Sequence, residues 1–159
     1  MSGAHFNPAV TTAAAVQRSI SLREAMAFIA AQFAGACSGV IAAHAMFSLP
    51  LIQTSSHARG SLGESLGEVI ATFGLLTISL SSRAPLAHIA AAVSLWITAA
   101  YWFTSSTSFA NPAVTFARSL TNSFAGIPPN HVLAFMGSQL AVVVLSLVIG
   151  PWLAPARSD

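Results

Sequence analysis

The sequence has 159 residues, of which 55% are apolar and only 6% are charged, with a net charge of +2. Soluble globular proteins carry about 25% charged residues, so ten charged side chains cannot cover a water-facing surface. This composition excludes an ordinary soluble domain and predicts that the solvent is a lipid bilayer. The six basic residues form no cluster, which argues against a nucleic-acid partner. A single cysteine, Cys37, excludes a disulfide framework within the chain.

Four segments are apolar and long enough to cross a bilayer, which takes about 20 residues. In chain order, they are residues 25–49, 63–82, 86–104 and 131–153. The break between the second and third is the short sequence Arg83-Ala84-Pro85. The sequence therefore predicts an all-α membrane protein with four spanning helices.

Two further segments, residues 8–17 and 112–121, are too short to span. Each follows an Asn-Pro pair, in which asparagine suits the N-cap of a helix and proline suits its first position. Ten residues rise roughly 15 Å in a helix, about half the thickness of the hydrocarbon core. We therefore predict two re-entrant half-helices that begin near the middle of the membrane.

An internal repeat links these segments. Only four asparagines occur in the chain, and two of them open the identical sequence Asn-Pro-Ala-Val-Thr, at Asn7 and at Asn111. Downstream of the first copy, Ala27, Phe28 and Gln32 recur after the second as Ala134, Phe135 and Gln139. The chain crosses the membrane three times between the two copies, so the second half-helix enters from the opposite side, as in the inverted repeats of transport proteins.

The doubled motif predicts a channel for neutral polar solutes. Each half-helix begins with unpaired N–H groups and a positive partial charge, which repels cations and attracts an oxygen atom. The amides of Asn7 and Asn111 can donate hydrogen bonds to such an oxygen. Oppositely oriented dipoles in the two halves should also hinder proton transfer along a file of water. We expect a polar track of backbone from Gly3, Ala4, His5, Phe6, Thr107, Phe109 and Ala110.

These motifs resemble those of the aquaporin (major intrinsic protein) superfamily. Ser2-Gly-Ala-His-Phe-Asn-Pro-Ala-Val-Thr11 is similar to its first pore loop, and Ser108-Phe-Ala-Asn-Pro-Ala113 to its second. The sequence Glu68-x-x-x-Thr72-Phe73 resembles the acidic helix that opens its second repeat. The resemblance covers essentially the whole chain and implies six membrane helices, two half-helices, a pore in each protomer, a homotetramer and a place in the cell membrane. It also implies that Asn7, Pro8, Ala9, Asn111, Pro112 and Ala113 form the pore motifs.

The chain departs from the family pattern in where its first motif lies. The family has two spanning helices ahead of that motif, whereas Asn7 lies seven residues from the start. We therefore expect one partial channel domain over residues 1–159, with the rest of the first repeat in 1–49 and the second repeat in 63–153. Roughly 60 residues of the family pattern are expected to be missing.

A second departure concerns the selectivity filter. The family usually places arginine directly after the second Asn-Pro-Ala, and this chain has Val114. The resemblance places the other filter positions at Ser108 and Ala99. All three side chains are small or apolar, which predicts passage of glycerol, urea or metalloid hydroxides besides water. Arg118, one helical turn beyond Val114, is an alternative source of the missing charge.

The same sequence bears on three other functions: a transporter, an enzyme and an inactive fragment. Glu68 lies inside an apolar segment, where an acid is expensive; we expect it to accept hydrogen bonds from the second pore loop, and a proton relay is the alternative. With Glu68 as the one candidate, an ion-coupled transporter is disfavoured. No G-x-S-x-G or H-E-x-x-H motif occurs, which argues against an enzyme. We expect no cofactor; a truncated, non-conducting channel fragment is the alternative to a working channel.

Overall fold

The computed structural model describes residues 5–81 and 85–153, and this part of the chain is helical without strands. The elements are α1 (Pro8–Val16), α2 (Leu22–Met46), α3 (Leu62–Ser81), α4 (Leu86–Phe103), α5 (Pro112–Ala117), the 3-10 turn η1 (Arg118–Leu120) and α6 (Pro129–Leu153). The four long helices are long and apolar enough to cross a membrane. The predicted all-α fold with four spanning helices is therefore confirmed. Gly3, Ala4 and Arg83, to which the sequence assigned roles, lie outside the described residues.

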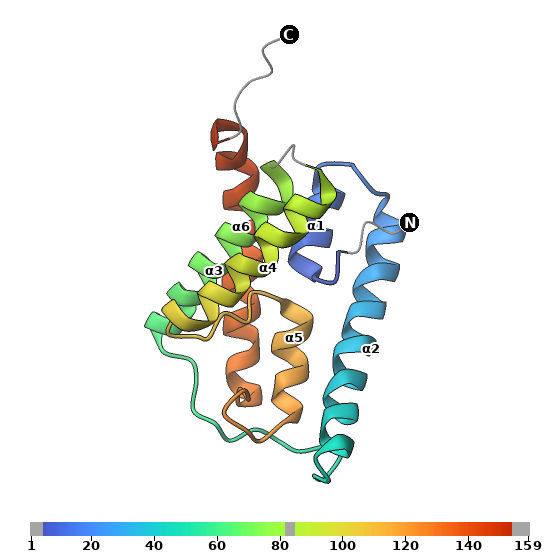
Figure 1. The fold of residues 1–159 in the computed structure, drawn as a ribbon, viewed down its shortest axis with the longest axis vertical. Helices are drawn as coiled ribbons and strands as arrows, with labels where there is room; N and C mark the ends of the chain where they lie inside the picture. The colour runs from blue at the N-terminus through green and yellow to red at the C-terminus, as the bar shows by residue number, and fades with distance from the viewer. Residues whose placement is uncertain (1–4, 82–84, 154–159) are drawn as a thin grey trace.

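The helices are arranged around α3 and α6, which pack against each other (Figure 1). Helix α4 packs on α3, and α2 packs on the two short helices α1 and α5. Figure 1 shows α1 in one half of the molecule and α5 in the other, each beginning near the middle and running towards its own end. This is the inverted arrangement that three crossings between the two motifs require.

Two spanning helices begin with capping boxes. The Ser21 side chain accepts a hydrogen bond from the Glu24 backbone at 3.2 Å, while Glu24 accepts from the Ser21 backbone at 2.9 Å. Ser61 and Glu64 repeat this pattern at the start of α3. A capping box satisfies two N–H groups that the first helical turn leaves free. Helix α2 consequently starts three residues before the predicted residue 25.

The second half-helix is shorter than predicted. Helix α5 ends at Ala117 and continues as the 3-10 turn η1, whereas the sequence predicted one helix over residues 112–121. The Arg118 carbonyl accepts from the N–H groups of both Thr121 and Ile127, at 3.5 and 3.3 Å. These bonds turn the chain away from the helix axis, and 3-10 turns are common at such ends. Helix α1 ends at Val16, one residue before the predicted end.

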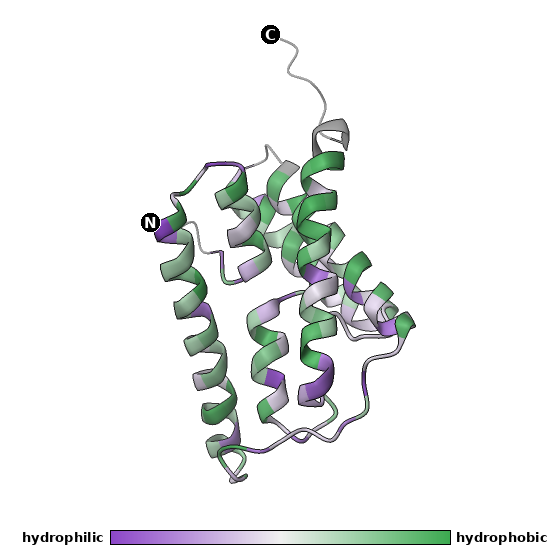
Figure 2. Ribbon diagram, turned by 180° about the vertical axis from the view of Figure 1, so that it is seen from behind, coloured by the Kyte–Doolittle hydropathy of each residue, from purple (hydrophilic) through white to green (hydrophobic). Residues whose placement is uncertain are grey.

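The outer faces of the spanning helices are apolar. Figure 2 shows hydrophobic colouring along most of their length, with most of the hydrophilic colouring in connections and helix ends. Only 6% of the most apolar stretch is buried in α2 and in α4, against 33% in α3 and in α6. Helices α2 and α4 thus present most of their side chains outwards, as lipid or a partner helix would require.

A buried polar cluster joins α3, α5 and α6 behind the second half-helix. Glu68 on α3 is 0% exposed and accepts hydrogen bonds from the backbone N–H groups of Phe109 and Ala110, at 2.8 and 2.7 Å. The Gln139 amide on α6 donates to Glu68 at 2.5 Å and to the Thr115 hydroxyl at 2.8 Å. A buried carboxylate is tolerated when its lone pairs are filled in this way. The cluster therefore fixes the second half-helix against the centre of the fold.

We predict that Gly74→Ala destabilises the packing of α3 on α4. A methyl group at Gly74 would overlap the Trp96 indole, which is itself held by a 2.9 Å hydrogen bond to the Ala71 carbonyl. Overpacking of this kind costs about 1–3 kcal/mol. The free energy of unfolding in mixed detergent and dodecyl sulfate micelles measures the loss. Gly35→Ala is the control, since nothing lies within 4 Å of its added methyl group; equal losses in both variants would contradict the prediction.

We also predict that Glu68→Gln destabilises the protein by about 2–3 kcal/mol, because a hydrogen bond to a charged group is replaced and the amide brings N–H donors into a site built from donors. The same unfolding titration measures the change. Glu24→Gln is the matched control, since Glu24 is exposed and glutamine can keep its capping hydrogen bond to the Ser21 backbone. A Glu68→Gln loss no greater than that of Glu24→Gln would show that the buried carboxylate contributes nothing to stability.

Candidate functional site

The two half-helices begin in the same way. Asn7 and Asn111 are N-cap residues with extended backbones, at φ −151° and −156°. The Asn7 side-chain oxygen accepts from the Ala9 backbone at 2.9 Å, and that of Asn111 accepts from Ala113 at 3.0 Å. In each helix, proline occupies the first position, where its missing N–H costs nothing. The doubled sequence thus folds into a doubled local structure.

The nitrogen of each asparagine amide binds the opposite pore loop. Asn7 Nδ2 donates to the Ala110 carbonyl at 2.7 Å, and Asn111 Nδ2 donates to the Phe6 carbonyl at 2.9 Å. Phe6 and Ala110 occupy equivalent places and share a left-handed backbone, at φ 40° and 48°. An amide group has two N–H donors, so each asparagine keeps one hydrogen for another acceptor. The sequence predicts that both amides face a permeating oxygen, whereas in the structure one N–H of each amide binds the opposite pore loop.

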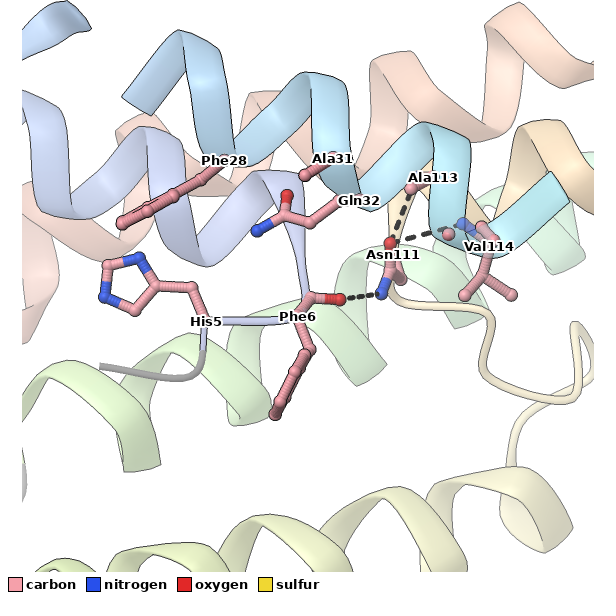
Figure 3. Close-up of a pocket in the computed structure, with 10 residues that line it drawn as sticks. His5, Phe6, Phe28, Ala31, Gln32, Asn111, Ala113 and Val114 are labelled. Carbon is pink, nitrogen blue, oxygen red and sulfur yellow. Dashed lines mark hydrogen bonds between the residues drawn. The ribbon is translucent and has the colours of Figure 1, made fainter. Parts of the chain in front are cut away.

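A cavity of about 470 Å³ lies beside this junction, between the half-helices and α2. Figure 3 shows the Asn111–Phe6 hydrogen bond at its wall, with the Val114 side chain beyond Asn111 and the His5 ring at the other end. Most of the lining is apolar or small, and the polar groups are few. The lining residues are His5, Phe6, Phe28, Ala31, Gln32, Gly35, Ala36, Asn111, Ala113 and Val114.

The three predicted filter residues do not meet at this cavity. Val114 lines it, whereas Ser108 is buried and does not belong to its lining, and Ala99 is exposed on α4. The next residue on α4, Ala100, is the one that packs against Ala110. The Ser108 backbone N–H donates to the Ser106 hydroxyl at 3.2 Å, and within the described residues the Ser108 hydroxyl has no partner.

The predicted backbone track divides into two parts. His5 and Phe6 line the cavity, and the His5 ring lies edge-on to Phe28 with 6.0 Å between centroids. Thr107, Phe109 and Ala110 lie outside it: Phe109 packs on Phe135, and Ala110 packs in a small apolar cluster with α3 and α4. Of the predicted backbone track, only His5 and Phe6 in the first pore loop therefore line this cavity, while the second loop reaches it through Asn111 and Ala113.

The repeated glutamines bind the repeated threonines, a role that the sequence analysis did not assign. Gln32 Nε2 donates to the Thr11 hydroxyl at 2.9 Å, just as Gln139 Nε2 donates to the Thr115 hydroxyl at 2.8 Å. The recurrence of both residue types in the two repeats was the available signal. In the second repeat, Glu68 completes the cluster; in the described part of the first repeat, no carboxylate reaches Gln32, whose oxygen is buried without a partner.

The electrostatics of the junction follow from the two helix starts. The N-termini of α1 and α5 converge where Asn7 and Asn111 exchange hydrogen bonds with the opposite loops. Helix N-termini carry positive partial charge and favour anions and lone pairs over cations. Among the described residues that line the cavity, His5, Gln32 and Asn111 have the polar side chains. This arrangement can bind the oxygen of an uncharged solute and disfavours a cation.

The sequence matches the family described as Major intrinsic protein over residues 1–87. It is 45% identical to the aquaglyceroporin AqpS of Rhizobium meliloti (strain 1021), over 99% of this chain and 68% of that protein. It is 32% identical to aquaporin-6 of Mus musculus and 34% identical to aquaporin-1 of Rattus norvegicus. These alignments cover 92% and 95% of this chain, but only 53% and 61% of the two mammalian proteins. No solved structure matches the chain significantly.

The family match covers more than half of the chain, and the bacterial relative aligns with nearly all of it. The paired Asn-Pro-Ala helix starts and the four membrane-capable helices agree with both findings. The chain therefore belongs to the major intrinsic protein family, whose members are multi-pass channels of the cell membrane and not enzymes.

Proposed function

We propose that this chain forms a passive route for water and for larger uncharged solutes, namely glycerol, urea or metalloid hydroxides such as arsenite. The observation that carries the proposal is the position of Val114, which lines the cavity next to the Asn111 amide at the start of α5. An arginine here would add a long cationic side chain to the wall. Valine leaves the wall short and apolar, with the amide as the nearest hydrogen-bond donor.

The names of the relatives agree with this proposal. The bacterial relative is called an aquaglyceroporin, and the two mammalian relatives are called aquaporins. The cavity is also of a suitable kind, since a mostly apolar wall with a few polar groups is typical of sites for small molecules. Both features favour small neutral solutes as a class, and Val114 favours those larger than water.

We further propose that the paired helix starts exclude ions and protons. A cation at the junction would lose its water shell close to two positive helix ends. The helices α1 and α5 run in opposite directions from the junction, so water on the two sides would be oriented oppositely, which interrupts proton transfer. No cofactor is needed for passage of this kind. We propose a homotetramer as the assembly, in which the exposed faces of α2 and α4 meet lipid or neighbouring protomers.

The alternative is a fragment that does not conduct on its own. The observation that favours it is the exposure of α2, because only 6% of its most apolar stretch is buried, against 33% of that of α6. The cavity lies on this side of the molecule and has α2 as one wall. The relatives are also longer, since the chain spans 68%, 53% and 61% of their lengths.

We predict that proteoliposomes containing the full chain swell in a glycerol gradient and swell much less in a sorbitol gradient. Stopped-flow light scattering measures both rates, and a pH or sodium gradient should change neither. Empty liposomes give the background rate. Glycerol swelling at the background rate, with the protein shown to be folded and inserted, would support the non-conducting fragment.

We predict that Val114→Arg lowers glycerol permeability at least about tenfold and leaves water permeability within about twofold, since a narrowed, charged wall hinders the larger solute. Val16→Arg is the matched control, because Val16 is exposed at the end of α1. Unchanged glycerol flux in Val114→Arg would contradict the role given to Val114.

A further inference from the structure

Arg59 links three stretches of chain, namely its own connection, the loop with Ser106, and the segment 124–126. It lies in the connection between α2 and α3 and is only 7% exposed. Its guanidinium donates to the carbonyls of Ser106 at 2.8 Å, Phe124 at 2.8 Å and Gly126 at 2.9 Å. Within the described residues, it forms no ion pair with a carboxylate. The donors of arginine have a fixed planar geometry, so three such bonds fix the positions of three backbone segments relative to one another.

One of these segments is the second pore loop, whose backbone is strained. Thr107, Ser108 and Ala110 all have left-handed conformations, at φ 58°, 49° and 48°. Residues other than glycine disfavour this region, so the surrounding structure must hold them there. Glu68 holds the loop from one side by binding the N–H groups of Phe109 and Ala110. Arg59 holds it from the other side by binding the Ser106 carbonyl. Ser108 lies between these two attachments.

The Phe109 ring connects Arg59 to the end of the second half-helix. The Arg59 guanidinium carbon lies 5.1 Å from the ring centroid, and that of Arg118 lies 4.1 Å from it. Both distances are within the range of cation–π attraction. Arg118 is the C-cap residue of α5, the helix that carries Val114. The loop that carries Ser108 and the helix that carries Val114 are thus tied to the same buried cation.

The guanidinium of Arg59 holds backbone segments in place through its fixed set of donors. Burial lowers its pKa, while the negative charges of Glu64 and Glu68 act in the opposite direction. Arginine stays protonated in proteins, so all its donors remain available at any physiological pH. The Val114 side chain lines the cavity and has no hydrogen-bond donor of its own, so its position depends on the contacts that hold α5 and the second pore loop in place.

We propose that Arg59 is a positioning residue, which holds the second pore loop and, through Phe109 and Arg118, the half-helix that carries Val114, and which thereby sets the size limit for solutes. The inference rests on the proposed function of the chain as a solute channel. It adds to that function the residue, outside both pore motifs, that sets its selectivity.

The test compares Arg59→Gln with Arg23→Gln, a matched change at an exposed arginine on α2. The measured quantity is the ratio of glycerol to sorbitol permeability in proteoliposomes, which does not depend on how many channels fold. We expect the ratio to fall at least about threefold in Arg59→Gln and to stay at the wild-type value in Arg23→Gln. Arg59→Lys keeps the charge but lacks the planar set of donors, so it should also lower the ratio. An unchanged ratio in Arg59→Gln, or full recovery in Arg59→Lys, would overturn the proposal.

A second measurement needs no transport. Cys37 is the only cysteine in the sequence. Cys37→Ser combined with Ser108→Cys therefore places a single thiol in the second pore loop. The rate at which a water-soluble methanethiosulfonate modifies this thiol reports how firmly the loop is held. Adding Arg59→Gln or Arg59→Lys removes a hydrogen bond from a charged group to the loop. The loop should then open more often, and the modification rate should rise about tenfold. If no solute passes, the proposed function fails, and the labelling rate still decides on Arg59: an unchanged rate would overturn its positioning role.

Discussion

Two hydrogen bonds, from Asn7 to the Ala110 carbonyl and from Asn111 to the Phe6 carbonyl, hold the middle of this molecule together. Each half-helix begins at a depth where lipid offers no hydrogen bonds, so neither could lie there alone. Each asparagine side chain satisfies a backbone carbonyl of the other loop. The same side chains cap their own helices through their oxygen atoms. One residue type therefore fixes the start of each half-helix and joins the two halves, and among the described residues it leaves one N–H donor of each amide available.

The two repeats share this junction but differ in what stands behind it. In the second repeat, Gln139 binds both Thr115 and Glu68, and the carboxylate holds the pore loop. In the first repeat, Gln32 binds Thr11 and also lines the cavity. The second half is thus closed by its own helices α3 and α6, whereas α2 leaves one side of the first half open. The proposed channel and the proposed fragment differ in what covers that side.

Much of this arrangement could be predicted from the sequence, because it depends on local or repeated patterns. Apolar runs gave the spanning helices, and the Asn-Pro pairs gave the two half-helix starts to the residue. The start of α2 was predicted three residues late, although Ser21-x-x-Glu24 is itself a capping signal. The three bonds of Arg59 could not be predicted, since the carbonyls that it binds lie 47 to 67 residues further along the chain, in loops whose shape no local pattern sets. For the same reason, position in a motif did not show that Ala99 lies on an exposed face of α4.

The left-handed backbones of Phe6 and Ala110 have a consequence for the order in which the protein assembles. Neither residue is glycine, so surrounding contacts must hold each left-handed backbone, and the asparagine of the other loop supplies one of them. Because each loop holds part of the other, we expect the two loops to become ordered together, after the third crossing has been made. The long helices satisfy their own backbone hydrogen bonds, so we expect them to insert before the half-helices take their final positions. We therefore expect the junction to form late, and a substitution that disrupts one loop to weaken the order of both.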